Sequence, residues 1–168
     1  MTISELLADA FGRIGATVHS AVEGLSPEEL SYRIDDESNP IVWLIWHLTR
    51  MQDDHIADVA GTEQVWTSAG WAERFGLPLP VADTGYGHSS DQVAVVVSEP
   101  EDLLGYYDAV EQVTLAYVRG LSDDDLDHIV DERWNPPVTL GVRLVSVIGD
   151  DVAHAGQAAY VRGILERR

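Results

Sequence analysis

The chain is most hydrophobic in the stretch NPIVWLIWHL, which spans residues 39–48. Asn39 is a favoured N-cap residue, Pro40 suits the first turn of a helix, and Gly61 is a typical stop. The stretch therefore predicts a helix from about Pro40 to Ala60, in which the apolar run is too short to cross a bilayer. One histidine, His47, lies within this apolar run.

Three further segments have the apolar spacing of long helices. The first runs from Ile3 to Glu23, where Thr2 and Glu5 predict a capping box. The others run from about Pro100 to Arg119 and from Thr139 or Leu140 to Glu166. Four long helices predict an all-α chain, folded as an up-down four-helix bundle in which residues 1–168 form one domain.

A weak internal repeat supports a bundle built from two similar halves. Residues 24–30, GLSPEEL, resemble residues 120–126, GLSDDDL, and Asn39-Pro40 recurs as Asn135-Pro136. Both pairs are 96 residues apart. The repeat predicts an approximate two-fold axis relating two helix pairs, each with an Asn-Pro start to its second helix. The alternative is that Leu-Ser-x-x-x-Leu is simply a common way to begin a helix.

A long connection, Thr62 to Glu99, separates the second and third predicted helices. Connections of this length in small domains are usually functional or pack as a lid. We expect a short helix near residues 62–75. Four side chains either line the mouth of a pocket or simply cover one end of the bundle: Trp66, Trp71, Tyr86 and His88.

Composition excludes several classes of function. A net charge of −19 argues against a nucleic acid or an anionic membrane surface as partner. The absence of cysteine excludes a disulfide scaffold, a cysteine-ligated zinc site and a cysteine nucleophile, so any thiol chemistry needs a thiol from a small molecule. Residues 1–5 lack the basic start of a signal peptide, and the cytoplasm is the expected location.

The last predicted helix carries Asp150 and His154 four residues apart, one turn along the same face. Val147 and Ala158 continue that face as an apolar stripe, so we expect both polar residues to face the bundle while Asp151 and Arg162 turn away. The alternative is an exposed i,i+4 ion pair, which contributes only about 0.3–0.5 kcal/mol.

A lone histidine in an apolar helix is usually a hydrogen-bonded core residue, and this alternative applies to His47. With Asp150 and His154 on a second helix, however, the chain offers two imidazoles and one carboxylate for one divalent metal, with a coordination position left open. His55 is expected on the surface. Arg50 and Arg143 either meet an anionic ligand or pair with acidic residues.

The motifs resemble those of the DinB-like superfamily over essentially the whole chain. Residues 39–48, followed by Arg50 and Asp53-Asp54-His55, resemble its second-helix motif, and HAGQ at residues 154–157 resembles its last-helix motif. The likeness is closest to actinobacterial proteins near the mycothiol-dependent maleylpyruvate isomerases. It implies metal ligation by His47, Asp150 and His154. Asp150 departs from the commonest pattern, which has histidine there, whereas the isomerase branch has glutamate.

The resemblance also implies a function. A divalent metal, zinc first and nickel, iron or manganese as alternatives, would favour the thiolate of mycothiol, bacillithiol or a similar thiol. The expected activity is a thiol S-transferase or a thiol-dependent isomerase acting on a small electrophilic substrate, with a homodimer compatible with the family. Two alternatives stay open: a non-enzymatic, stress-related metal- or ligand-binding protein, and a metal hydrolase that uses bound water.

Overall fold

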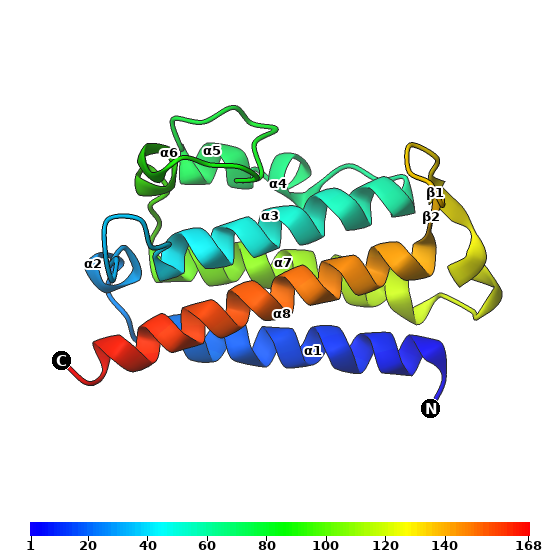
Figure 1. Cartoon of the computed structure of the whole chain (residues 1–168), viewed down its shortest axis with the longest axis horizontal. Coiled ribbons are helices and arrows are strands. Elements are labelled where there is room, and N and C mark those ends of the chain that lie inside the picture. The colour runs from blue at the N-terminus through cyan, green and yellow to red at the C-terminus, as the bar shows by residue number, and fades with distance from the viewer.

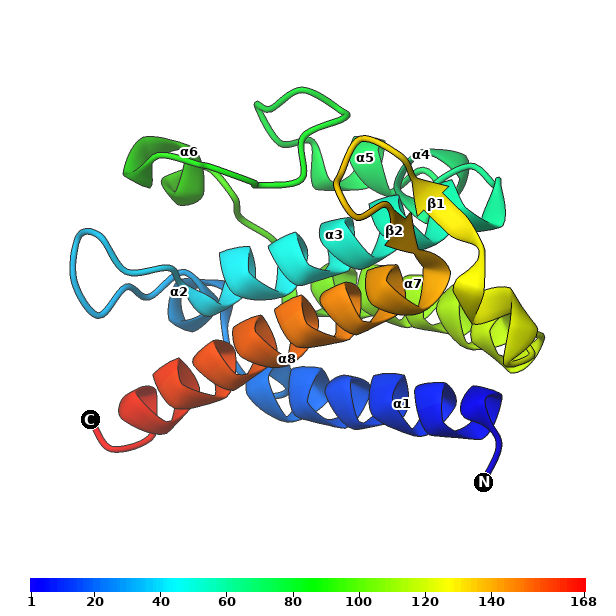
Figure 2. The ribbon, with the colours of Figure 1, turned by 45° about the vertical axis from the view of Figure 1, so that its right-hand side comes forward.

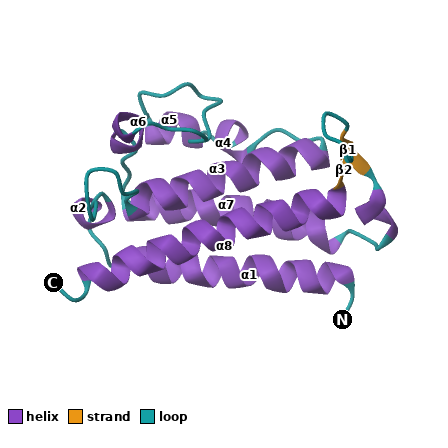
Figure 3. Ribbon diagram, in the orientation of Figure 1, coloured by secondary structure: helices purple, strands orange, loops and turns teal.

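The computed structural model describes all 168 residues and is an all-α bundle with one minor two-stranded sheet (Figures 1 and 3). The long helices are α1 (Ile3–Val22), α3 (Ile41–Ala60), α7 (Pro100–Arg119) and α8 (Leu140–Leu165). The short elements are α2 (Pro27–Leu30), α4 (Val65–Ser68), α5 (Trp71–Phe75), α6 (Ser90–Ala94), η1 (Asp124–Asp127), β1 (Ile129–Asp131) and β2 (Val138–Thr139). None of the helices is long and apolar enough to span a membrane. The expected all-α four-helix bundle is confirmed. Its long helices do not alternate strictly up and down, because α3 and α7 run in the same direction (Figure 1).

Local sequence explains where the long helices begin and end. Thr2 and Glu5 form the predicted capping box at the start of α1. Gly61 ends α3 in the left-handed conformation, as predicted. The N-cap of α3 is Pro40, not Asn39, and no side chain caps this end. Asn39 thus keeps its side chain available for other contacts.

The long connection determines the direction of the second helix pair. It returns along the outside of α3, from the end of that helix to the level of its start, so α7 runs parallel to α3 and α8 runs antiparallel to it (Figures 1 and 2). Helix α3 packs against α8 and α7, and α1 packs against the opposite sides of the same two helices. The expected short helix in the connection is present as two turns, α4 and α5.

The hydrophobicity of residues 39–48 follows from their position. Helix α3 packs on α7 and α8, and the connection with α4 covers part of what remains. Every residue from Pro40 to Arg50 is consequently buried, and the side chains of α3 join one apolar core shared by all four long helices. A histidine within this segment is held rigidly by its surroundings.

The two halves share part of the predicted repeat. Each has a long helix, a short acidic helical turn and a second long helix, with α2 and η1 in equivalent places. The prediction fails at Asn135-Pro136, which lies in the turn between β1 and β2, while Thr139 caps α8 through the backbone N–H of Val142. The short sheet lies between η1 and α8, whereas the corresponding connection of the first half, residues 31–40, forms no strand.

Helix α8 corrects one expectation about orientation. Asp151, expected to turn outward, is fully buried in the core stripe with Leu144, Val147 and Ala155. The error arose because a helix with two buried faces does not have a single inward stripe. Asp150 and His154 lie beside His47 of α3, whereas Asp151 lies on the neighbouring, buried face of α8. Arg162 is partly exposed.

Candidate metal centre

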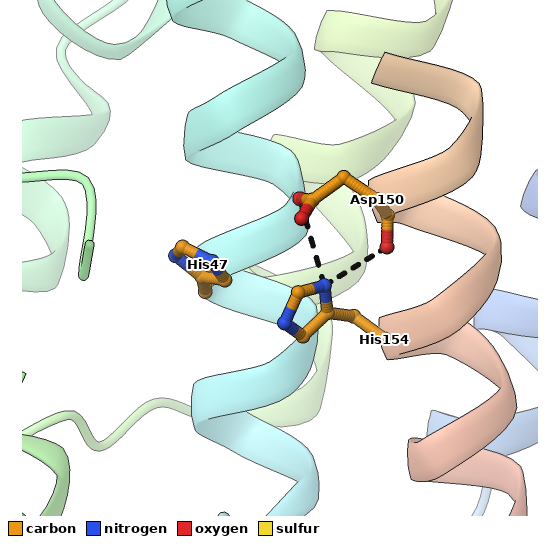
Figure 4. Close-up of side chains that lie close together, drawn as sticks. All are labelled: His47, Asp150 and His154. Carbon is orange, nitrogen blue, oxygen red and sulfur yellow. Dashed lines mark hydrogen bonds and ion pairs between the residues drawn. The ribbon is translucent and has the colours of Figure 1, made fainter. Parts of the chain in front are cut away.

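The fold brings His47 of α3 together with Asp150 and His154 of α8 (Figure 4). One potential ligand atom from each side chain lies within 4.8 Å of the others. His154 and Asp150 remain 17% and 35% exposed, so the cluster can be reached from solvent, whereas His47 is buried. The structure thus juxtaposes the three side chains singled out in the sequence.

A backbone contact fixes the orientation of His47. Its Nδ1 lies 2.5 Å from the carbonyl oxygen of Thr84, in the long connection. The ring also stacks on Trp43, with centroids 4.6 Å apart and planes within 14°. A metal-binding histidine typically donates its other ring N–H to a carbonyl or carboxylate. With Nδ1 as donor to Thr84, Nε2 is the atom that His47 offers to a metal.

Gly85 permits the close approach of the connection to His47. It has a φ of +88°, and a Cβ atom there would lie 2.8 Å from His47 Nδ1 and 3.0 Å from the ring of Trp46. Only glycine accommodates both the left-handed backbone and this proximity without strain. Residues 83–85 are therefore a second element of the site, which the sequence reasoning missed. The Gly85-Tyr86-Gly87 pattern, with two glycines in the left-handed conformation, is the sequence feature that could have indicated this tight turn.

His154 is oriented within its own helix. Its Nδ1 lies 2.9 Å from the backbone carbonyl of Asp150 and 3.5 Å from Asp150 Oδ2 (Figure 4). The backbone contact leaves Nε2 on the side that faces His47. Both histidines therefore direct the same type of nitrogen into the space between α3 and α8.

The donor set fits a divalent metal. Asp150 Oδ2 is buried and makes no hydrogen bond, and its recorded ion-pair contact is with His154 Nδ1 at 3.5 Å, so a cation between the helices would stabilise the carboxylate further. Two imidazoles and one carboxylate are a common three-ligand set for zinc that leaves one position free. Other divalent transition metals accept the same donors.

Protonation equilibria differ between the two histidines. The nearby Asp150 carboxylate raises the pKa of His154, while burial lowers the pKa of His47. The close contact with His154 in turn lowers the pKa of Asp150. A metal would compete with protons for the imidazole nitrogens, so metal binding at this centre is expected to weaken as pH falls.

Arg50 anchors the long connection from within the core and does not face a ligand. Its side chain is fully buried, and Nε donates to the carbonyl of Asp83, the residue before Thr84. Nη1 donates to Gln64 and Tyr106 and lies 3.8 Å from the buried Asp53 carboxylate. Of the two alternatives for Arg50, the structure supports pairing with an acidic residue.

The remaining sequence candidates fall into three groups. His88 is buried beside the centre, accepting from Trp43 Nε1 and contacting Asp83. Trp66 and Trp71 pack on Tyr106 as cover for the bundle, and Tyr86 is exposed. His55 and Arg143 lie together, with Arg143 paired to Asp131, two turns away from Asp150 along α8. None of these belongs to the three-residue cluster.

Replacing Arg50 with methionine is expected to destabilise the fold by about 3–5 kcal/mol, because the change leaves the buried Asp53 carboxylate without its cation. It should also weaken metal binding roughly 10–100-fold, since the segment that orients His47 loses its anchor. Thermal unfolding in the presence of chelator measures the change in stability. Metal titration, at a temperature where the variant is folded, measures the change in metal affinity.

The matched control for this prediction is Arg74→Met. Arg74 pairs with Asp102 at the surface and is 59% exposed. For this control we expect the free energy of unfolding to fall by less than about 1 kcal/mol and the metal affinity to stay unchanged. Equal behaviour of the two variants would contradict the role of Arg50.

Comparison with known proteins identifies the family of this chain. A profile for the family described as Mycothiol-S-transferase matches residues 6–167. The chain belongs to the mycothiol S-transferase family. This family is DinB-like, so the resemblance inferred from the motifs is confirmed. No curated protein matches the chain.

A solved structure provides the second comparison. The structure of a conserved protein from Enterococcus faecalis is similar to this chain with a TM-score of 0.92 and 30% sequence identity. The likeness covers 100% of this chain and 99% of that chain. The two structures therefore share the bundle and its long connection, and not only a helical core.

Proposed function

We propose that this chain is a metal-dependent mycothiol S-transferase that joins a small-molecule thiol to an electrophilic substrate. The observation that carries the proposal is the cluster of His47, Asp150 and His154, partly open to solvent in a member of this family. Zinc is the proposed metal, and the proposed thiol places the reaction in the cytoplasm.

The metal, when bound, would supply positive charge that favours the thiolate form of the co-substrate at neutral pH. His47 and His154 would each present a neutral Nε2, because the Nδ1 atoms are committed to the carbonyls of Thr84 and Asp150. Asp150 would balance part of the cation's charge. The Trp43 ring, stacked on His47, excludes water from that side of the imidazole.

The absence of cysteine is consistent with a reaction in which the co-substrate supplies the sulfur and the protein supplies charge and orientation. The chain has no thiol of its own, so the nucleophilic sulfur must come from the co-substrate. The protein contributes orientation and charge, the terms that dominate when two bound reactants are brought together. Transfer forms a bond between the sulfur and the electrophilic carbon, and the leaving group departs with the bonding electron pair.

A transferase assay tests the proposal. Protein stripped with chelator and reloaded with zinc, nickel, iron(II) or manganese is mixed with monochlorobimane and one thiol: mycothiol, bacillithiol or glutathione. We expect a rate above the uncatalysed reaction that needs both metal and mycothiol. A metal-loaded protein with no rate for any thiol would favour the binding-protein alternative, and metal-dependent hydrolysis of esters without thiol would favour the hydrolase.

A further inference from the structure

A groove lies beside the candidate metal centre, between α8 and the loop that precedes α3. Its volume is about 610 Å³, within the range of sites that hold small ligands. Ala153 and Gln157 of α8 line it on both sides of His154 in sequence, and Leu44 lines it one turn before His47 on α3. The groove therefore begins within about one helical turn, 5.4 Å, of two of the three proposed ligands.

The groove offers neutral polar groups and an aromatic face. Its polar lining includes the amides of Asn39 and Gln157, the hydroxyl of Tyr160 and the carboxylate of Glu37. These four side chains make no hydrogen bonds within the protein, so their donors and acceptors are available. Amides, a carboxylate and an aromatic ring beside apolar residues suit a ligand with many hydroxyl groups, which needs both acceptors and donors together with contact for its C–H faces.

One wall of the groove is held in place before any ligand binds. Residues 35–38 form a turn in which Ser38 Oγ accepts from Asp35 N–H and donates to the Asp35 carbonyl. Arg33 donates from Nε to the Ser38 carbonyl and from Nη2 to Ser90 of α6. This turn positions Glu37 and Asn39, so little conformational entropy is lost when a ligand contacts them.

Charge distinguishes the ligands that fit the groove. No lysine, arginine or histidine lines it, Glu37 contributes a negative charge, and the whole chain carries −19. An anionic thiol such as glutathione, with two carboxylates, would be repelled there. A thiol whose cysteine is acetylated and amide-linked to a glucosaminyl-inositol unit has no such charge, and its hydroxyl groups match the lining.

We propose that this groove binds the uncharged, hydroxyl-rich sugar portion of the thiol co-substrate, leaving its sulfur to reach the space between His47 and His154. The single cysteinyl unit that joins sugar to sulfur spans the short separation between groove and centre. The inference rests on the proposed transferase function, but it assigns a separate subsite whose occupancy does not require the metal.

Gly156 provides a substitution that blocks the groove without disturbing the fold. It lines the groove, and a Cβ at this position meets no atom within 4 Å. Gly149, two turns earlier on the exposed surface of α8, is equally open and lies outside the groove. Gly156→Leu and Gly149→Leu are therefore a matched pair, since both remove a helix-interior glycine and add the same side chain.

The probe is N-acetylglucosaminyl-inositol, which has the sugar portion but no sulfur, titrated by NMR against metal-free protein. We expect binding to wild type, to Gly149→Leu and to His154→Ala, and at least 10-fold weaker binding to Gly156→Leu. S-methylglutathione should bind all four proteins at least 10-fold more weakly than the sugar binds wild type. Gly156→Leu should keep wild-type metal content.

Two results would overturn the inference: equal sugar affinity for Gly156→Leu and Gly149→Leu, or binding of S-methylglutathione as tight as that of the sugar. The proposed function fails separately. If the metal-loaded wild type binds the sugar at the groove yet transfers no thiol to monochlorobimane, the subsite stands and the transferase proposal falls. If transfer occurs and the sugar shows no groove binding, the subsite falls alone.

Discussion

The variant His154→Ala is expected to lose the metal and, with it, the transferase rate. The substitution leaves only His47 and Asp150, from two different helices, as donors. Loss of a partner that merely orients a ligand typically lowers metal affinity 10–100-fold, and loss of a ligand itself should exceed that. We expect metal content near zero after purification and dialysis, and a thiol-transfer rate lower by more than about 100-fold.

The His154→Ala experiment compares metal content by elemental analysis in wild type, His154→Ala and His128→Ala. His128 is a useful control because it follows η1 and its side chain is 71% exposed. Metal-free thermal unfolding should be similar for all three proteins, since His154 lies at the edge of the apolar core and is not one of the residues that form it. If His154→Ala retains as much metal as His128→Ala, or all three proteins stay metal-free after supplementation, the three-residue centre is wrong.

The long helices and the shared face of Asp150 and His154 could be predicted from the sequence because each depends on local spacing. Apolar residues at helical intervals located α1, α3, α7 and α8, and the four-residue spacing of Asp150 and His154 placed both on one face. The meeting of His47 with this pair depends on the relative rotation of α3 and α8, which the spacing alone does not determine. The family resemblance supplied that step.

The parts that could not be predicted depend on tertiary contacts. Thr84 and Gly85 reach His47 only because the connection folds back along α3, and no periodic pattern marks that path. From its residue type alone, Arg50 is expected on the surface, yet the same connection buries it fully. Asp151 was misplaced because a polar residue in a core stripe contradicts the rule used to find the stripe.

Asp151 gives the second large prediction, which concerns stability. Its side chain is fully buried, and neither carboxylate oxygen has a hydrogen-bond partner. Burial raises its pKa well above the ordinary range, with a smaller contribution from the Asp150 charge. Asp151 is therefore protonated in the folded protein at pH values where the unfolded chain has already lost that proton.

The consequence is a loss of stability as pH rises. Below about pH 4 both states hold the proton, and Asp151 imposes only the cost of an unsatisfied buried group. Above that value the unfolded chain releases the proton, so the free energy of unfolding falls by about 1.4 kcal/mol per pH unit until the folded-state pKa is reached. The destabilisation is therefore larger at pH 7.5 than at pH 4.5.

Asp151→Leu should remove both contributions and continue the apolar stripe of Val147 and Ala155. At pH 7.5 we expect the free energy of unfolding of the variant to exceed that of wild type by about 3 kcal/mol, which corresponds to an increase in Tm of roughly 6–12 °C for a chain of this size. The difference should shrink at pH 4.5. Asp151→Asn removes the titration but keeps unsatisfied polar atoms, so it should flatten the pH dependence with a smaller gain.

Urea unfolding at both pH values, in chelator, measures these differences, with Asp58→Leu as the control. Asp58 is exposed on α3, and its replacement removes one aspartate and adds the same leucine side chain without relieving a buried carboxyl group. A destabilised Asp151→Leu at pH 7.5 would mean that a group such as a bound water satisfies the carboxylate and that the aspartate supports the fold. Stabilisation with unchanged metal content would instead show that the two adjacent aspartates have different roles. Asp151 would be an unfavourable buried carboxyl group in the core, and Asp150 would be the carboxylate available to a metal.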